Sequence, residues 1–304
     1  MILVVVGSSP IRWPKKERRT IMSKKLETLV DDIYGLFKGG HVVKEENLQT
    51  CLANIGANIK KSLFEANNKE RRNLRMSSIG TPDRKLWFLH NLPMEQQEVF
   101  NGPTNIKFMY GHIVEELVLL LAKEAGHLVE GQQDTLTIDG VEGHRDARID
   151  GVTVDVKTAS KWSFQKFEKA TLFNDDPFGY IAQISAYMEA EGDKRGAFVA
   201  INKESGEIVV LMVDEDRKID AAKRIQEVKE VVALKEPPYK PCYEPVPFGG
   251  SGNMVLNKNC GFCAFKDICW AGANGGQGLR KFQYAGKIEE FVFVGKEPKV
   301  EEIR

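Results

Sequence analysis

One short stretch of the sequence, GHRDARIDGVTVDVKTAS, carries carboxylates and a lysine at spacings that could support metal-dependent chemistry. Asp150-Gly151 lies between two runs of alternating residues, a pattern that predicts a β-hairpin with a two-residue loop. That loop fixes the register and places Asp146 directly opposite Asp155, with Lys157 on the same face as Asp155. Facing carboxylates repel each other, so the arrangement favours a divalent cation between them. A lysine beside such a cation is typical of metal-dependent hydrolases.

The same register makes further predictions about the hairpin. If Ile149 pairs with Val152, then His144 lies opposite Lys157. The valines of the second strand would face the core: Val152, Val154 and Val156. The alternative is that Asp155 and Lys157 form an ordinary solvated charge pair on an exposed strand face.

A helical pattern upstream supplies a third acidic group. Residues 107–125 carry apolar side chains at helical spacing, interrupted by Glu115 and Glu116. His112 lies on the same helical face as Glu115. The alternative is that these acids are first-turn residues that complement the helix dipole.

Taken in order, these elements resemble the RecB-type branch of the PD-(D/E)XK nucleases. The resemblance covers roughly residues 75–270 and departs from the family pattern at Arg145, which precedes Asp146 in place of a proline. Four segments carry it: Gly111–Glu115, Gly143–Asp146, Asp155–Lys157 and Gln183–Tyr187.

The resemblance implies an α/β fold with a restriction-endonuclease-like core, in which helices flank a mixed sheet. It also implies phosphodiester hydrolysis with one or two Mg²⁺ or Mn²⁺ ions, which prefer oxygen ligands. Four residues would hold the metal: Glu115, Asp146, Asp155 and the carbonyl of Val156. Lys157 would orient the attacking water or offset developing charge. Gln183 and Tyr187 would position the DNA backbone or the Lys157 side of the site, with His144 and Glu116 as secondary candidates.

Five cysteines supply a second set of potential ligands. Cys260, Cys263 and Cys269 have the spacing C-x2-C-x5-C, and Cys242 precedes them by 17 intervening residues. Four thiolates suit either a structural zinc ion or a [4Fe-4S] cluster. Disulfides are the alternative, but the odd number of cysteines favours a reducing compartment.

The resemblance favours the iron–sulfur cluster, because RecB-type nucleases of the AddB and CRISPR-associated kinds carry one. In those relatives, three cysteine ligands follow the nuclease core and one precedes it. Here the segment Thr81–Trp87 matches the earlier ligand motif, but Asp83 stands where the cysteine is expected. We therefore predict that Cys242 is the fourth ligand and that Cys51 is a buried helical thiol.

The net charge is zero, so any nucleic-acid contact must come from local basic patches. Residues 60–85 hold eight Lys or Arg against three acids, and residues 157–169 interleave lysines with aromatic residues. This composition suits single-strand binding by backbone contacts and base stacking, although 157–169 would also suit a solvated amphipathic face with buried rings. Arg84, Lys85 and Lys161 are the candidate phosphate contacts.

The chain divides into four regions. We expect a disordered basic arm over 1–22, a helical region over 23–90, the nuclease core over 91–236, and a cysteine-bearing region with a final hairpin over 237–304. Helices are predicted at 23–38, 44–72, 81–89, 107–125, 178–190 and 215–234, and strands at 133–138, 143–149, 152–158, 195–202, 207–213 and within 280–296. Residues 92–106 are predicted to form a loop.

The function these observations favour is a metal-dependent DNA exonuclease in replication, recombination or repair, similar to viral enzymes of that kind. No base-reading module is recognisable, so DNA with free or single-stranded ends is the expected substrate. A replication or recombination protein is the expected partner. The alternative is a non-catalytic nucleic-acid-binding protein organised by the four-cysteine metal centre. No apolar run reaches the ~20 residues of a membrane span, and we expect a cytoplasmic location, including a host cytoplasm for a viral protein.

Overall fold

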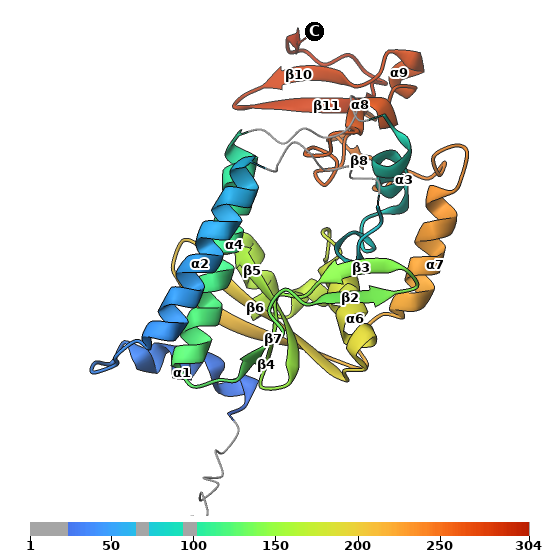
Figure 1. Ribbon diagram of the computed structural model, residues 1–304. Coiled ribbons are helices and arrows are strands. Elements are labelled where there is room, and N and C mark those ends of the chain that lie inside the picture. Colours follow the sequence, from blue (N-terminus) through green and yellow to red (C-terminus); the bar gives the residue numbers. More distant parts are fainter. Residues whose placement is uncertain (1–23, 65–72, 94–101, 304) are drawn as a thin grey trace, which may run out of the picture.

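A mixed five-stranded sheet forms the centre of the computed structural model, which describes residues 24–64, 73–93 and 102–303. Its order is β1-β4-β5-β6-β7, and β5 pairs with β6 in parallel whereas the other pairs are antiparallel. The strands are β1 (Val129–Glu130), β4 (Ala147–Ile149), β5 (Val152–Ala159), β6 (Arg195–Asn202) and β7 (Ile208–Asp214). Helices cover both faces of this sheet (Figure 1). The predicted α/β class, a mixed sheet flanked by helices, is confirmed.

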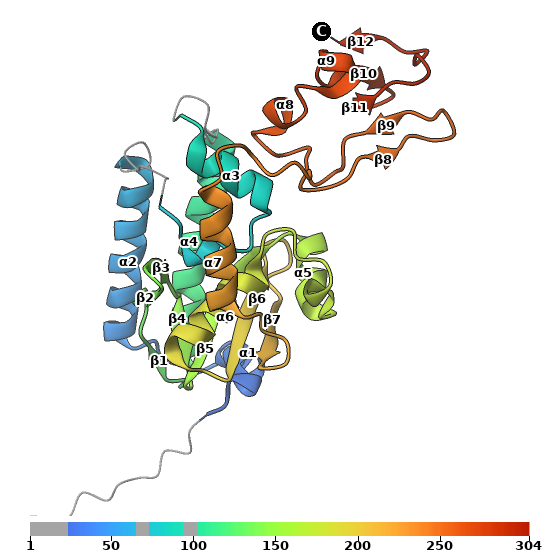
Figure 2. The ribbon, with the colours of Figure 1, turned by 90° about the vertical axis from the view of Figure 1, so that its right-hand side faces the viewer.

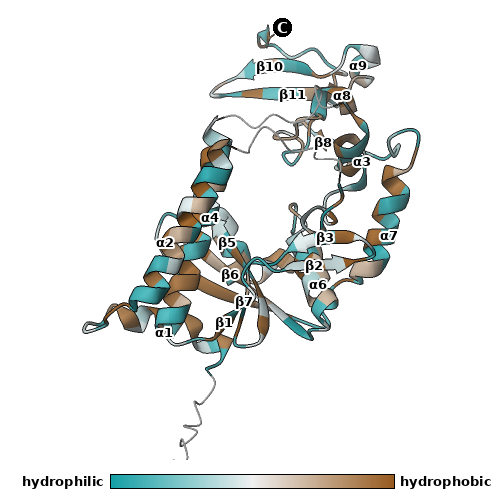
Figure 3. Ribbon diagram, in the orientation of Figure 1, coloured by the Kyte–Doolittle hydropathy of each residue, from teal (hydrophilic) through white to brown (hydrophobic). Residues whose placement is uncertain are grey.

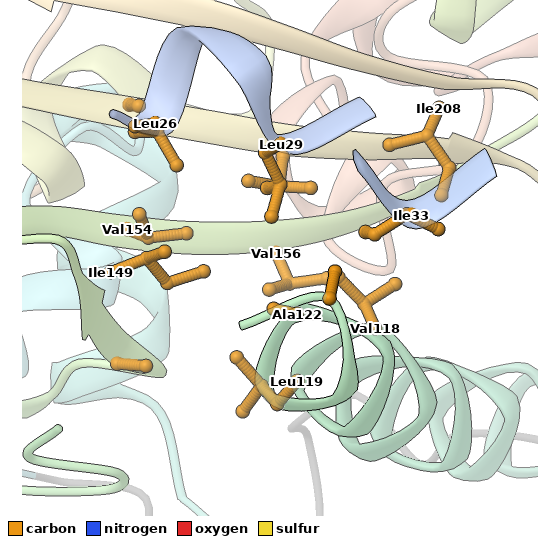
Figure 4. Packing of buried hydrophobic residues seen from close by; sticks show 14 residues of the cluster. Leu26, Leu29, Ile33, Val118, Leu119, Ala122, Ile149, Val154, Val156 and Ile208 are labelled. Carbon is orange, nitrogen blue, oxygen red and sulfur yellow. The ribbon is translucent and has the colours of Figure 1, made fainter. Parts of the chain in front are cut away.

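One face of the sheet packs against the helical N-terminal part of the chain. The short η1 (Leu26–Thr28), α1 (Leu29–Leu36) and α4 (Gly102–Glu124) lie on this face, with α2 (Glu45–Phe64) packed along α4. Leu119 and Val118 of α4 meet Val154 and Val156 of β5, which are buried as predicted (Figure 4). Each of these side chains loses its contact with water, so the face anchors α4 and β5 to each other.

The other face of the sheet packs against the helices that follow β5. These are α5 (Lys161–Glu168), η4 (Thr171–Phe173), α6 (Tyr180–Glu191) and, behind α6, α7 (Ala221–Val232). Phe164 and Phe167 of α5 pack against Phe198 of β6, together with Ile184 of α6. Strand β5 is therefore covered on both sides, by α4 and by α6. Figure 3 shows hydrophobic colour along the neighbouring strands β6 and β7.

A separate two-stranded hairpin, β2 (Thr135–Ile138) with β3 (Val141–His144), lies beside α6. The 310 turn η2 (Met76–Ser78) contacts β3 and α6, and α3 (Asp83–Asn91) packs against α7. The prediction of one continuous strand over 143–149 is wrong, because the chain leaves the ladder at residues 145 and 146. Arg145 at this break is buried and pairs with Asp134 and Glu191.

A second five-stranded sheet forms most of the C-terminal region. Its order is β12-β10-β11-β9-β8, and Figure 2 shows it set apart from the central sheet, with α8 close to α3. The elements are β8 (Val246–Pro247), β9 (Met254–Val255), α8 (Lys266–Cys269), α9 (Ala273–Gly276), β10 (Arg280–Tyr284), β11 (Lys287–Phe293) and β12 (Glu302–Ile303). Phe282 and Phe291 make its small core with Val255. The hairpin predicted within 280–296 is confirmed.

Helices α4 and α7 each begin five or six residues away from the predicted start. Helix α4 begins at Gly102, so the loop predicted over 92–106 is wrong for residues 102–106. Helix α7 begins at Ala221, because Asp220 caps it by accepting a hydrogen bond from the Lys223 amide. The predicted basic arm over 1–22 and the predicted end of the second helix over 65–72 lie outside the described residues. Within residues 24–64, 73–93 and 102–303, no helix is long and apolar enough to cross a bilayer.

Candidate active site

The predicted hairpin register is confirmed, but the ladder is shorter than predicted. Ile149 pairs with Val152, and the last pair is Ala147 with Val154. Beyond this pair the chain leaves the ladder. The Asp146 side chain reaches β5, where its Oδ2 accepts a 2.6 Å hydrogen bond from the Val156 amide. Asp146 therefore does not lie in the ladder opposite Asp155, although the two carboxylates interact electrostatically.

His144 does not face Lys157, and that prediction is wrong. Its strand, β3, pairs with β2 instead, so His144 lies opposite Thr135. The two side chains approach to 3.1 Å, between Thr135 Oγ1 and His144 Nδ1. The segment 143–149 was predicted to be one strand of the hairpin. Because the chain changes direction at Arg145, its first part, β3, belongs to the sheet with β2, and its second part, β4, belongs to the central sheet.

Asp155 and Lys157 share the face of β5 that is covered by α6. They do not form the solvated charge pair on an exposed face that was the alternative prediction. The Lys157 Nζ lies 2.6 Å from Asp155 Oδ2, and Asp155 is only 1% exposed. Burial alone would lower the pKa of Lys157, but the carboxylates of Asp155 and Asp146 outweigh it and raise the pKa. Lys157 is therefore a cation over the physiological pH range.

Helix α6 supplies a chain of polar contacts to Lys157. Lys157 Nζ donates to Gln183 Oε1 at 3.3 Å, and Gln183 Nε2 donates to Tyr187 Oη at 3.0 Å. The four-residue spacing of Gln183 and Tyr187 places both on one side of the helix. Burial raises the pKa of Tyr187, so its hydroxyl stays protonated. The predicted Gln183/Tyr187 element thus lies on the Lys157 side of the site.

Tyr180 belongs to this arrangement and was missed in the sequence. The Lys157 Nζ lies 4.6 Å from the centroid of the Tyr180 ring, within the range of a cation–π interaction. Its position one helical turn before Gln183 was the available signal, because residues three apart on a helix are neighbours.

Glu115 of α4 is the third carboxylate near Asp146 and Asp155. It is buried, its Oε1 accepts a 2.7 Å hydrogen bond from Gln133 Nε2, and its Oε2 lies 3.8 Å from His112 Nδ1. Gln133 has a backbone φ of 57°, a conformation that non-glycine residues rarely adopt. Nothing in the sequence pattern pointed to Gln133.

Glu116 faces away from these groups. Its Oε2 accepts a hydrogen bond from Asn54 of α2 at 3.0 Å, and burial raises its pKa. Glu116 therefore belongs to the packing of α2 against α4, as does Cys51, whose Sγ donates to the Glu116 carbonyl oxygen. Cys51 is buried, and the prediction of a helical thiol away from the other cysteines describes this position.

We call Glu115, Asp146 and Asp155 the acidic floor. Burial raises the pKa of Asp146 well above its usual range, and the charges of Asp155 and Glu115 raise it further. Burial also raises the pKa of Asp155, although Lys157 opposes the rise. Asp146 and Asp155 thus share one lysine while Glu115 adds a third negative charge beside them, and a cation bound among the three would relieve the repulsion.

The acidic floor offers oxygen ligands, the type that Mg²⁺ and Mn²⁺ prefer. The buried Asp155 Oδ2 has no hydrogen-bond donor among the described residues, although the Lys157 ammonium lies beside it. Within the same residues, no three His, Cys, Asp or Glu side chains stand ready to hold a metal ion. The carboxylates of the acidic floor instead contact Gln133, the Val156 amide and Lys157. The donor set fits such a cation once the carboxylates turn from these partners.

A cavity of about 1260 Å³ lies above the acidic floor. Glu115, Asp146, Gln183 and Tyr187 line it, while Asp155 and Lys157 lie beneath its surface. Basic and imidazole side chains from surrounding elements also line it: Lys61, Arg75, His90, His112, His144 and Lys229. The cavity is large enough for several nucleotide-sized groups, and its walls carry Lys61, Arg75 and Lys229 together with the carboxylates of Glu115, Glu142 and Asp146.

Four of the five cysteines interact electrostatically with one another, and we call Cys242, Cys260, Cys263 and Cys269 the cysteine cluster. As the structure describes them, no three of them stand ready to hold a metal ion. No disulfide joins any of the cysteines, all of which are described. Burial, together with the charges of the three neighbouring cysteines, raises the pKa of Cys260 to about 12. Deprotonating these thiols together would therefore require a bound cation.

Helix α3 donates hydrogen bonds to the cysteine cluster. Arg84 Nε donates to Cys269 Sγ at 3.1 Å, and the Lys85 backbone amide donates to the sulfur of Cys242. Arg84 Nη1 donates to the carbonyls of Pro238 and Tyr239, and Nη2 donates to the carbonyl of Cys269. Asp83 instead pairs with Arg224 of α7 at 2.6 Å. Cys242, rather than Asp83, thus lies beside the other three cysteines.

The three residues predicted to contact phosphate lie in two separate places. Arg84 and Lys85 are on α3 at the cysteine cluster, where Arg84 already has four acceptors. Lys161 begins α5, and its backbone amide donates to Glu204. Within the segment 157–169, Phe164 and Phe167 are buried, whereas Trp162 is 77% exposed. Their contacts with nucleic acid stay predictions.

Comparison with known proteins gives limited guidance. No protein-family model and no curated protein matches the chain. Among solved structures, an alkaline exonuclease from Laribacter hongkongensis is similar at a TM-score of 0.38 and 16% identity, over 54% of this chain and 87% of that one. A phage-related exonuclease from Haemophilus somnus is similar at a TM-score of 0.35 and 14% identity, over 53% of this chain and 90% of that one. The function is therefore argued from the residues themselves.

Proposed function

We propose that this protein is a metal-dependent deoxyribonuclease that degrades DNA from free ends. The observation that carries the proposal is the acidic floor with Lys157 directly beside it at the base of a large cavity. Buried carboxylates that repel one another reduce stability unless a cation joins them. Such a cost is typical of a functional site.

The residues in and beside the acidic floor would have three roles: metal binding, contact with the water or phosphate, and positioning of Lys157. Glu115, Asp146, Asp155 and the Val156 carbonyl would hold Mg²⁺ or Mn²⁺, which activates water and offsets charge on the phosphate when bound. Lys157, kept charged by its neighbours, would contact the attacking water or the phosphate oxygens. Gln183 and Tyr187 would hold the Lys157 ammonium in place through their hydrogen-bond chain.

Preference for a DNA end is the finer part of the proposal. The cavity walls include Lys, Arg and His side chains that could contact phosphates, and such contacts hold the backbone without reading bases. Binding through phosphates should weaken steeply as salt concentration rises. We propose single-stranded or frayed ends as the substrate.

The test is digestion of labelled DNA in linear and covalently closed circular form, each single- and double-stranded, with Mg²⁺, Mn²⁺ or chelator. We expect metal-dependent release of nucleotides from linear substrates only. Rapid cutting of closed circles would contradict the requirement for an end and leave the nuclease assignment intact. Absence of cleavage with retained DNA binding would favour the non-catalytic binding protein.

We further propose that the cysteine cluster binds one metal centre, a [4Fe-4S] cluster in preference to zinc. Two N–H groups of α3 point at its sulfur atoms, and such donors stabilise thiolate ligands. The preference for iron rests on the family resemblance, because four thiolates suit both metals. Anaerobically purified protein should be brown, with broad absorbance near 400 nm, whereas colourless protein with stoichiometric zinc would reverse the choice.

A further inference from the structure

Aromatic rings lead from Lys157 to the protein surface. The Lys157 Nζ lies over the half-buried ring of Tyr180, and Tyr180 stacks on Phe178 with ring centroids 5.4 Å apart and an angle of 25° between the rings. Phe178 is 62% exposed. The last ring of this stack is therefore open to solvent, two rings from the proposed catalytic lysine.

The backbone holds Phe178 in a fixed position. Gly179 has a φ of 75°, and a Cβ added to it would lie 2.4 Å from the Cα of Gly80. The chain just before α6 is thus pressed against the chain just before α3. Asp176 also caps α6, because its Oδ2 accepts a 2.8 Å hydrogen bond from the Ile181 amide. A ring held in this way loses little conformational entropy when it binds a ligand.

The charges beside Phe178 are compatible with a polyanionic ligand. Asp175, three residues before it, forms an ion pair with Lys166 of α5 at 2.8 Å. The Asp176 carboxylate points at the N-terminus of α6, whose partial positive charge offsets its own. Repulsion of a phosphate chain is reduced at both acids.

We propose that Phe178 is a stacking site for one nucleobase of the bound DNA strand, on the Lys157 side of the acidic floor and beyond the residues that line the cavity. This proposal rests on the nuclease function proposed above and adds a binding site to it. Base–aromatic stacking tolerates any of the four bases, so the site would fix the strand near Lys157 without selecting sequence.

An abasic scan of a single-stranded oligonucleotide tests the proposal. The full chain binds the labelled oligonucleotide without added divalent cation, and one base at a time is removed from the strand. In the wild type, one position should show a loss of affinity of about tenfold. In Phe178→Ala, affinity for the intact strand should fall by a similar factor, and that position should become insensitive to base removal.

Two further variants make the scan specific. Phe178→Trp should keep the position-dependent loss, because the indole ring also stacks. Phe37→Ala is the matched control, since Phe37 ends α1 on the opposite face of the sheet and is 73% exposed; its scan should equal that of the wild type.

The outcomes separate this site from the function on which it rests. If the wild type binds and digests DNA while Phe178→Ala keeps the same position-dependent loss, the stacking site is wrong and the nuclease proposal stands. If the wild type neither binds the oligonucleotide nor digests DNA with Mg²⁺ or Mn²⁺, both proposals fail together.

Discussion

The acidic floor and the cysteine cluster both gather potential metal ligands, but the chain supports them in different ways. The side chains of the floor come from β5, from α4 and from the segment between β3 and β4. Strand β5 and helix α4 also contribute to a large buried apolar cluster. The cysteine cluster lies among turns and the four-residue helix α8, which buries none of its own residues. We infer that the floor is built by the hydrophobic core and persists without metal, whereas the cluster depends on what it binds.

The largest expected effect is on cleavage, at the floor. Lys157→Ala and Asp146→Asn should each reduce the rate of DNA digestion by about 10²–10³-fold or more, because each removes a charge at the reacting phosphate or its metal. Single-turnover digestion of end-labelled DNA measures the loss, and Glu116→Gln, which faces α2, is the matched control. Near wild-type digestion by Asp146→Asn would disprove the assignment of the floor.

The next effect is on the integrity of the C-terminal region, at the cysteine cluster. Cys260→Ser should lose the metal centre and make residues 237–304 sensitive to protease, while the core stays resistant. Metal analysis and limited proteolysis with mass spectrometry measure both changes. Cys51→Ser should keep full metal content, since Cys51 packs against α4. Equal metal content in both variants would contradict the difference drawn between the two regions.

A smaller effect distinguishes two aspartates within the floor when no metal is present. Asp155→Asn should lower the free energy of unfolding by about 3 kcal/mol, because it leaves the buried Lys157 ammonium without its carboxylate. Asp146→Asn should raise it by about 1 kcal/mol, because it keeps the acceptor for Val156 and removes a repelled charge. Denaturant unfolding in chelator measures both, and equal losses in the two variants would contradict this account.

The pH dependence follows from the same asymmetry. The pKa of Asp146 is raised in the folded protein, so the folded state holds this proton more tightly than the unfolded chain does. The metal-free wild type should therefore lose stability as pH rises above the ordinary aspartate range. Asp146→Asn should lose less over the same range, and unfolding curves at several pH values would show the difference.

The smallest effect concerns the contact that links the two regions through α3. A Cβ on Gly80 would meet the backbone of Gly179 at 2.4 Å, so Gly80→Ala should cost about 1–3 kcal/mol and displace the start of α6. Gly56→Ala in α2 meets nothing within 4 Å and should stabilise the helix slightly. Thermal unfolding compares the two variants. An unchanged melting temperature for Gly80→Ala would contradict the close contact between Gly80 and Gly179.

The sequence predicted the local geometry of the floor better than its long-range geometry. Asp150-Gly151 fixed the register of β4 against β5 because a two-residue turn leaves no other choice. The break at Arg145 escaped prediction because it depends on ion pairs with Asp134 and Glu191, the second of which lies 46 residues away along the chain. Spacing alone cannot show that such partners exist.

The same distinction applies to the residues around the lysine and the cysteines. The four-residue spacing of Gln183 and Tyr187 is a local helical property and could be used. Gln133 reaches Glu115 only through a left-handed backbone turn, and Arg84 reaches Cys269 only through the docking of α3. These contacts are products of tertiary packing and leave no periodic signal.

The contact between Arg84 and Cys269 joins residues 185 positions apart, which has a consequence for the order of events during synthesis. Helix α3 leaves the ribosome early, whereas its cysteine partners leave after the whole central sheet has been made. At about 5–20 residues per second, the donors of α3 wait on the order of ten seconds or more for their sulfur acceptors. The central sheet can therefore fold first. Insertion of the proposed metal centre would then be the last assembly step, and it would fix α3 between the central sheet and the C-terminal region.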